Sequence, residues 1–154
     1  MIDDEWLRAL GQAVLYFSFV ETAVVAIISS LVPTAPSYMQ KAVKKTAGEV
    51  GKDFKKSIDT LPEGHLRSEL EQLAIRFGGA ISRRNDMLHT MPASFGEYTH
   101  LVRLTRDKFV VWSTAELLKT ATEFEKLAYD LDAAHRLMRA DFTIVDPCDE
   151  GRKD

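Results

Sequence analysis

Apolar residues recur every three or four positions along most of the chain, which is the spacing of one face of an α-helix. The first such segment covers residues 4–31, with acidic residues at its start and Pro33 and Pro36 after its end. Acidic residues suit the positive end of the helix dipole and prolines stop helices, so we expect one long helix with these limits. Residues 37–61, closed by Pro62, carry lysines on one side and apolar residues on the other. This pattern predicts a second, amphipathic helix.

Two further helices are expected in the second half of the chain. Residues 63–90 carry a regular apolar face, and Pro92 follows them. Residues 113–140 begin with Ser113-Thr114-Ala115-Glu116, which matches the capping box in which Ser and Glu satisfy each other's free backbone N–H groups. The last helix should therefore start at Ser113.

The stretch between these two helices follows a different pattern. Residues 93–100 are polar and irregular and are expected to form a loop. Residues 100–112 alternate or are rich in β-formers on both sides of residues 105–107, which predicts a small hairpin. We therefore expect an all-α fold, an up-and-down bundle of four long helices with a small β-hairpin before the last helix. It should form a single domain over residues 1–140, followed by a short tail at 141–154.

Composition narrows the class of protein only slightly. The net charge is −3, so nothing in the overall charge indicates a nucleic-acid-binding protein. The single cysteine, Cys148, excludes an internal disulfide framework, and we expect a cytoplasmic protein. The acidic N-terminal residues differ from the positive start of a signal peptide. The histidines and Cys148 show no zinc-ligand spacing, so neither a metal nor a cofactor is expected.

The apolar run at residues 13–32 is long enough to raise the question of a membrane span. Glu21 lies in the middle of this run, where a carboxylate costs ~2.5–3.5 kcal/mol. We therefore favour a helix buried on nearly all sides, in a bundle or in a homodimer, and no membrane contact.

One polar cluster in the third predicted helix could carry chemistry. Asn85 and His89 are four residues apart and share one helix face, and Arg84 flanks that face. An arginine can hold phosphoryl oxygens with two hydrogen bonds, and a histidine can move a proton near neutral pH. The combination suits a phosphate ester. A purely structural interpretation stays open, with solvated arginines and a histidine that caps the helix.

The segment Arg84-Asn85-Asp86-Met87-Leu88-His89 resembles the motif of the HEPN superfamily of helical nucleotide-binding domains. That motif is Arg-x(4–6)-His, usually with a polar residue directly after the Arg. Arg83 also fits one permitted gap, but Arg84 follows it, so Arg84 with Asn85 is the better match. Phe17 and Glu21 resemble a Phe-x-x-x-Glu pattern in the first helix of some HEPN-like bacterial proteins. Glu21 could pair with Arg83 or Arg84, or could simply lie at a surface or interface.

The resemblance implies a metal-independent endoribonuclease of toxin or phage-defence type that acts as a homodimer, with the active site at the dimer interface. His89 would move a proton as a ribose 2′-OH attacks the adjacent phosphate, which yields a 2′,3′-cyclic phosphate. Arg84 would stabilise the phosphoryl charge, and Asn85 would orient His89 or the phosphate. A cognate antitoxin, often a nucleotidyltransferase-like protein, is implied as a partner. The alternative is a non-catalytic helical dimer that binds a protein partner or a nucleotide.

The lysines of the second predicted helix offer a possible RNA-binding face. On a helical wheel they fall in one stripe, which consists of Lys41, Lys44, Lys45, Lys52, Lys55 and Lys56. Such a stripe could track phosphates. An ordinary solvated helix surface is the simpler explanation, because any amphipathic surface helix can be rich in lysine and no aromatic residues that could stack on bases are interleaved with these lysines.

Overall fold

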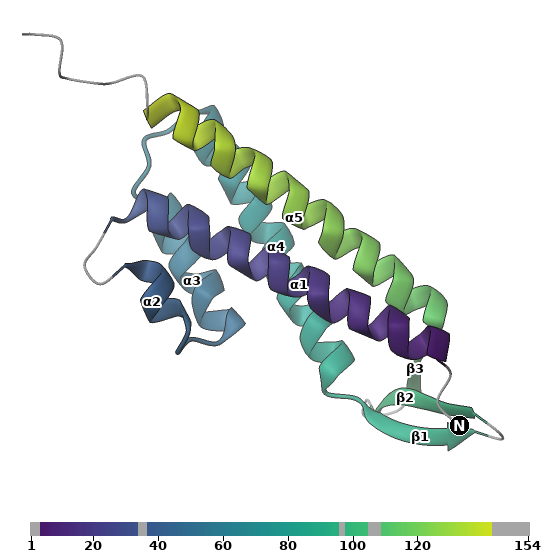
Figure 1. The fold of residues 1–154 in the computed structure, drawn as a ribbon. Coiled ribbons are helices and arrows are strands. Elements are labelled where there is room, and N and C mark those ends of the chain that lie inside the picture. The colour runs from purple at the N-terminus through teal and green to yellow at the C-terminus, as the bar shows by residue number, and fades with distance from the viewer. Residues whose placement is uncertain (1–3, 34–36, 96–97, 105–108, 143–154) are drawn as a thin grey trace, which may run out of the picture.

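The protein is mainly α-helical, as predicted, in a computed structural model that describes residues 4–33, 37–95, 98–104 and 109–142 (Figure 1). The helices are α1 (Asp4–Leu31), α2 (Tyr38–Ala42), α3 (Ala47–Ile58), α4 (His65–Leu88) and α5 (Thr114–Phe142). Three strands, β1 (Met91–Phe95), β2 (Tyr98–Leu104) and β3 (Phe109–Trp112), stand between α4 and α5.

The first and last predicted helices are confirmed within two residues at each end. The capping box predicted for α5 is also present. The Ser113 backbone N–H donates to the Glu116 carboxylate at 3.0 Å, and the Glu116 N–H donates to the Ser113 hydroxyl at 3.2 Å. Local sequence signals were sufficient here because both partners of the cap lie within four residues.

The prediction of one helix over residues 37–61 is wrong, because the chain breaks after Ala42 and begins a new helix at Ala47. The cause is a second capping box. The Thr46 side chain accepts from the Glu49 N–H at 3.3 Å, and the Thr46 N–H donates to the Glu49 carboxylate at 2.7 Å. These bonds start a new helix at Thr46, inside the segment that the helical-wheel pattern predicts to be one continuous helix.

The helix directions differ from the predicted up-and-down order. Trp6 bonds Trp112, which lies two residues before the start of α5, and Ser30 bonds His135 further along that helix, so α1 and α5 run parallel. Arg83 bonds Thr120 and Arg76 bonds Asp130, so α4 runs antiparallel to α5. Two contacts then fix α3, which runs antiparallel to α4: Gly51 lies against Ile81, and Arg67 faces Asp59. The short α2 returns the chain along α1, which gives α3 the direction of α1 (Figure 1).

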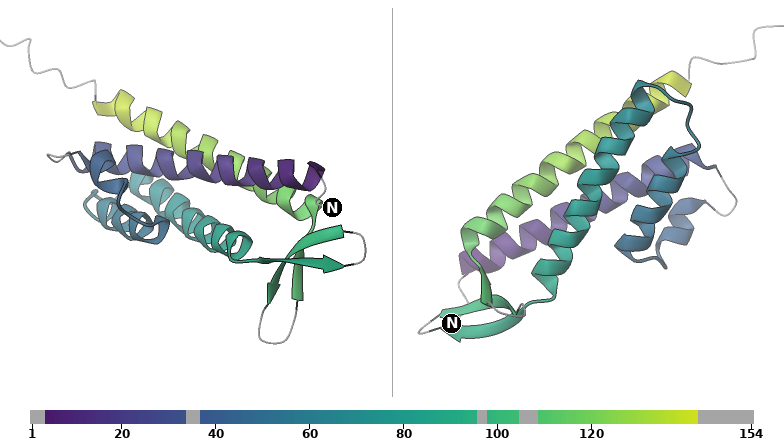
Figure 2. Two further views of the ribbon diagram at one scale, coloured as in Figure 1. Left: turned by 60° about the horizontal axis from the view of Figure 1, so that its bottom comes forward. Right: turned by 180° about the vertical axis from the view of Figure 1, so that it is seen from behind.

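The predicted hairpin at residues 100–112 is instead part of a three-stranded antiparallel sheet of order β1-β2-β3. The loop predicted at 93–100 is wrong for residues 93–95 of β1 and for residues 98–100 of β2, which pair with each other. The same register places Pro92 opposite Leu101. Pro92 is tolerated because β1 is an edge strand. The predicted turn at 105–107 and the tail beyond residue 142 lie outside the described residues. The sheet lies at the end of the bundle where α1 begins (Figure 2).

The core forms two neighbouring clusters. The larger one joins α1, α3, α4 and α5 around four fully buried side chains, Val20, Phe54, Phe77 and Leu131. The smaller one lies beside the sheet and contains Trp6, Met87 and Trp112. By length and composition alone α1 could cross a membrane, a test that the core helix of a soluble protein also passes.

Candidate functional site

One side-chain hydrogen bond and one backbone bond of the last helical turn lie within the polar cluster at the end of α4. The Arg84 guanidinium donates to the Asn85 side-chain oxygen at 3.0 Å, and the His89 backbone N–H donates to the Asn85 carbonyl at 2.9 Å. Arg84 and Asn85 are half-buried, and His89 is exposed at the C-cap of α4. The structure therefore places the three residues at one end of one helix, with the imidazole open to solvent.

The Arg84 guanidinium also lies over an aromatic ring of α1. Its central carbon is 5.5 Å from the centroid of the Phe17 ring, within the range of a cation–π interaction. Phe17 is itself buried between Phe77 of α4 and Phe124 of α5. The position of Arg84 is thus fixed by the core, while no carboxylate pairs with it among the described residues.

Arg83 has a different environment, although it is the next residue. Its Nε donates to the Thr120 hydroxyl at 2.8 Å, and the same nitrogen lies 3.8 Å from a Glu123 carboxylate oxygen. Its guanidinium also lies 5.3 Å from the centroid of the Trp112 ring. Arg83 therefore ties α4 to α5 and the sheet, which is a structural role.

Glu21 lies one helical turn after Phe17 on α1. It is half-buried in a shallow groove shared with α2 and the turn after it, where Val43 and Lys45 are neighbours. No ion pair joins Glu21 to Arg83 or Arg84 in the part of the chain that the structure describes. The hypothesis that Glu21 positions these arginines has no support in this geometry.

The six lysines do not form one stripe. Because the chain breaks between α2 and α3, Lys41 and Lys44 lie on different elements from Lys52, Lys55 and Lys56. The sixth, Lys45, is engaged with Asp53, at 2.9 Å between Nζ and the carboxylate oxygen. The exposed lysines still lie on and beside α3. The helical wheel placed them in one stripe because it treated residues 37–61 as one continuous helix, and the structure interrupts that helix.

Asp53 is the centre of a small polar cluster that the sequence did not indicate. The Tyr38 hydroxyl donates to the same carboxylate oxygen at 2.7 Å. Burial alone would raise the pKa of Asp53, but the hydrogen bonds from Tyr38 and Lys45 prevail and lower it. Burial, together with the bond to Asp53, raises the pKa of Tyr38 well above its usual range. This cluster fastens α2 to α3, so its role is structural.

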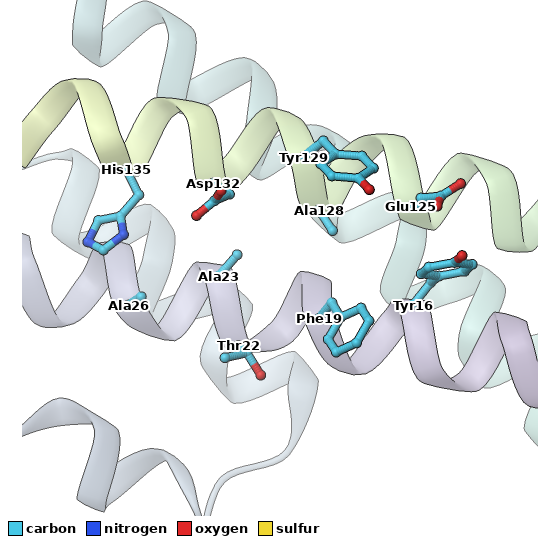
Figure 3. A pocket seen from close by; sticks show the side chains of 10 residues that line it. All are labelled: Tyr16, Phe19, Thr22, Ala23, Ala26, Glu125, Ala128, Tyr129, Asp132 and His135. Carbon is cyan, nitrogen blue, oxygen red and sulfur yellow. The ribbon is translucent and has the colours of Figure 1, made fainter.

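A groove with a volume of about 400 Å³ lies between α1 and α5 (Figure 3). Its α1 wall consists of Tyr16, Phe19, Thr22, Ala23 and Ala26. Its α5 wall consists of Glu125, Ala128, Tyr129, Asp132 and His135. The groove therefore combines aromatic rings, small residues and two carboxylates.

The ends of this groove are chemically different. The nearby Glu125 carboxylate, as a hydrogen-bond acceptor and as a negative charge, raises the pKa of Tyr16. At the other end His135 Nε2 and the Ser30 hydroxyl are hydrogen-bonded at 2.9 Å. Sequence reasoning missed the groove because it depends on the parallel pairing of α1 with α5, which no local pattern encodes.

In the part of the chain that the structure describes, no group of three His, Cys, Asp or Glu side chains could hold a metal ion. Cys148 lies outside those residues. Comparisons with protein-family models, with curated proteins and with solved structures found no match to this chain. The residues of the site must therefore carry the functional argument.

Proposed function

We propose that this protein is a metal-independent endoribonuclease in which Arg84 and His89 carry the chemistry. The observation that carries the proposal is the hydrogen-bonded arrangement of Arg84, Asn85 and the His89 backbone at the end of α4. The same helix end carries a cation without a carboxylate partner among the described residues and an exposed imidazole. These are the two groups that phosphodiester cleavage by an internal 2′-hydroxyl requires.

The contrast between the two adjacent arginines supports the choice of Arg84. Arg83 is occupied by Thr120 and Glu123. Among the described residues, Arg84 is positioned by the Phe17 ring and the Asn85 side chain, and neither of these neutralises its charge. A guanidinium that is fixed but electrostatically free can receive the phosphoryl oxygens of a substrate.

The reaction follows from these groups. The 2′-oxygen of a ribose attacks the adjacent phosphorus, and the bond from phosphorus to the 5′-oxygen of the next nucleotide breaks. The 2′-hydroxyl loses a proton and the leaving 5′-oxygen gains one, and His89 takes part in these transfers as base or acid. Arg84 stabilises the charge that develops on the phosphoryl oxygens. The products are a 2′,3′-cyclic phosphate and a 5′-hydroxyl.

The exposed lysines around α3 supply a plausible attraction for the RNA backbone. Lys44, Lys52, Lys55 and Lys56 are all exposed. Their contribution to affinity would be independent of sequence and would weaken as salt concentration rises. In this proposal the lysines contribute to the affinity for RNA, whereas Arg84 and His89 carry out the chemical step.

The proposal is tested by single-turnover cleavage of RNA in EDTA with Arg84→Ala and His89→Ala. We expect each to slow cleavage by ~10²-fold or more, since general acid–base groups and charge-stabilising donors each contribute on this scale. His65→Ala is the matched control, because His65 is an exposed histidine at the opposite end of the same helix. Circular dichroism must show that all variants fold.

Other outcomes would count against the proposal in different ways. Cleavage that survives both substitutions would place the activity elsewhere or in a contaminant. No cleavage by pure wild-type protein on transfer, messenger and ribosomal RNA would favour the non-catalytic helical binding module.

A further inference from the structure

We infer that the groove between α1 and α5 is a binding site for a small organic cation, an ammonium ion that carries an apolar tail. The ammonium head lies at the aromatic end of the groove, beside Glu125, and the tail lies toward the end that His135 closes. The size of the groove, its rings and its charge each support this assignment. Neither Arg84 nor His89 takes part, so the inference stands apart from the ribonuclease proposal.

The size and shape of the groove suit a small, elongated molecule. Its volume of about 400 Å³ falls within the range of small-molecule sites, ~300–1,000 Å³. The lining residues recur with helical spacing on both helices, and because α1 and α5 run parallel the two stripes stay face to face. From Glu125 to His135 the α5 wall rises by about 15 Å, at ~1.5 Å per residue.

Three aromatic rings gather at one end of the groove. The ring centroids of Tyr16 and Phe19 are 6.2 Å apart and the ring planes meet at 61°, so these two rings form a corner. The ring of Tyr129 stands across the groove from them (Figure 3). Phe19 is 50% exposed and Tyr129 is 66% exposed, so much of each ring is open to a ligand. Such rings attract a cation that lies within ~6 Å of their centroids, and quaternary ammonium ions are bound in this way.

Glu125 supplies negative charge at the same end. Its carboxylate raises the pKa of Tyr16, as a hydrogen-bond acceptor and as a charge, which places it beside the rings. In the part of the chain that the structure describes, no lysine or arginine pairs with Glu125, and none lines the groove. The carboxylate and the ring faces therefore attract a cation, whereas both repel an anion.

The opposite end of the groove determines the orientation of the ligand. Asp132 is the second carboxylate of the groove, but it is already paired with Arg136 one turn later. His135 Nε2 lies 2.9 Å from the Ser30 hydroxyl, a hydrogen bond that joins α5 to α1. The uncompensated charge thus lies at the aromatic end, which is where the ammonium head belongs.

Between the two ends the walls are mainly small and apolar. Ala23 and Ala26 of α1 face Ala128 of α5 across the groove (Figure 3). The Thr22 hydroxyl donates to the Ser18 carbonyl at 2.8 Å, so its polar group is satisfied by its own helix. A hydrocarbon tail would lose contact with water here and meet apolar surface.

The groove lies away from the Arg84–Asn85–His89 cluster. Phe17, whose ring lies against Arg84, and Phe19 are two residues apart and so are separated by about 200° around α1. Figure 1 looks onto α1 and α5 with α4 behind them, and α4 comes to the front from the opposite side (Figure 2, right). A ligand in the groove therefore touches neither Arg84 nor His89.

The first test measures the binding of defined probes by isothermal titration calorimetry. The probe is hexyltrimethylammonium, and the controls are hexanoate and hexanol, which carry a similar tail on a negative or a neutral head. We expect saturable binding of the cation, ~10-fold or more tighter than that of either control. Glu125→Gln keeps the size of the side chain but removes its charge, and should weaken cation binding several-fold. Glu123→Gln is the matched control, because it removes the same charge from α5 about 200° away around the helix.

The second test concerns the rings. Phe19→Leu and Tyr129→Leu keep an apolar side chain but remove the ring, and each should weaken binding of hexyltrimethylammonium by ~3-fold or more. Leu15→Ala should leave the affinity unchanged, since Leu15 is exposed on α1 but does not line the groove. Circular dichroism checks that every variant folds.

The third test locates the ligand by thiol labelling in a Cys148→Ser background, which removes the only cysteine. Ala128→Cys should react faster with a cationic methanethiosulfonate reagent than with an anionic one, and hexyltrimethylammonium should slow the reaction. Leu88→Cys lies at the end of α4, where Leu88 is 44% exposed, and should not be protected.

Several results would overturn the inference. Hexanoate could bind more tightly than the cation, or Glu125→Gln could bind the cation as well as wild type. Protection of Leu88→Cys in place of Ala128→Cys would put the ligand elsewhere. Absence of saturable cation binding, with a solution mass that falls to that of one chain in Phe19→Asp, would assign the groove to a second copy. Absence of binding without that change in mass would leave the groove without the inferred ligand. None of these measurements involves RNA cleavage, so failure of the ribonuclease proposal would not change them.

Discussion

Arg83 and Arg84 show how much the role of a residue depends on neighbours that are distant in sequence. The two side chains leave α4 about 100° apart. This difference sends one to Thr120 and Glu123 of α5 and the other to the Phe17 ring of α1. Both arginines fit the spacing of the motif, and the sequence favours Arg84 only because Asn85 follows it. The structure adds a physical reason, because only Arg83 is neutralised within the described residues.

Trp6 and Trp112 form a matched pair for measuring one buried hydrogen bond. Both rings are buried, at 6% and 7% exposure. Trp6 Nε1 donates to the Trp112 carbonyl at 2.9 Å, whereas Trp112 Nε1 has no hydrogen-bond partner among the described residues. We expect Trp6→Phe to cost more than Trp112→Phe by ~1 kcal/mol, because only the first leaves a carbonyl unpaired. Urea unfolding at equal protein concentration measures both. Equal losses would contradict this role for Trp6.

Asp53 should make the stability of the protein depend on pH. Its pKa is lowered by Tyr38 and Lys45 against the effect of burial. A carboxyl whose pKa is lower in the folded state stabilises the fold above its unfolded pKa of ~4, and the effect is lost as the pH falls through the folded pKa. Asp53→Asn should therefore cost about 1 kcal/mol at neutral pH and progressively less at acidic pH.

Urea unfolding of wild type and Asp53→Asn over a range of pH checks this prediction. Asp59→Asn is the control, since Asp59 is 72% exposed and its contact with Arg67 is 3.9 Å long. A difference between wild type and Asp53→Asn that stays constant or grows toward acidic pH would show that the carboxylate is not the stabilising form.

At the scale of elements, local sequence signals determined where several helices begin and end. The capping box at Ser113 was recognised, but the equivalent box at Thr46 and Glu49 was overlooked because the lysine pattern continued through it. The same Thr-x-x-Glu signal could have divided residues 37–61 correctly. The strand β1 was harder to predict, since Pro92 argues against a strand unless it lies at an edge.

Glycines inside two helices give a test of helix packing. A methyl group at Gly78 would meet no atom within 4 Å, whereas one at Gly51 would lie 3.2 Å from Ile81 Cδ1. Gly78→Ala should therefore stabilise the protein by ~0.5–1 kcal/mol through helix propensity. Gly51→Ala should gain less or lose stability, because the Ile81 side chain of α4 would have to shift to accept the added methyl group. Thermal unfolding compares them, and a larger gain from Gly51→Ala would contradict the close packing of α3 on α4.

At the scale of the whole molecule, the sequence was a good guide to helical content and a poor guide to arrangement. Periodicity located the helices because it is a property of one segment at a time. The parallel pairing of α1 and α5 depends on contacts such as Trp6 with Trp112 and Ser30 with His135, which no single segment encodes. The cluster at Arg84, Asn85 and His89 could be located because it lies on one helix. The groove of Figure 3 could not, because its walls are far apart in sequence.

The arrangement of the helices also connects the two proposals. The face with the exposed rings of Phe19 and Tyr129 and the cluster at the end of α4 lie on different flanks of α1.

The central claim is that Arg84 and His89 cleave RNA through its own 2′-hydroxyl, and the chemistry of the fragment ends tests it most directly. Cellular RNA is incubated in EDTA with wild type or His89→Ala, and the fragment ends are identified by mass spectrometry. We expect 2′,3′-cyclic phosphate and 5′-hydroxyl ends from wild type, and neither from His89→Ala or from 2′-O-methylated RNA. Fragments with 3′-hydroxyl and 5′-phosphate ends, or equal cleavage by His89→Ala, would contradict the claim.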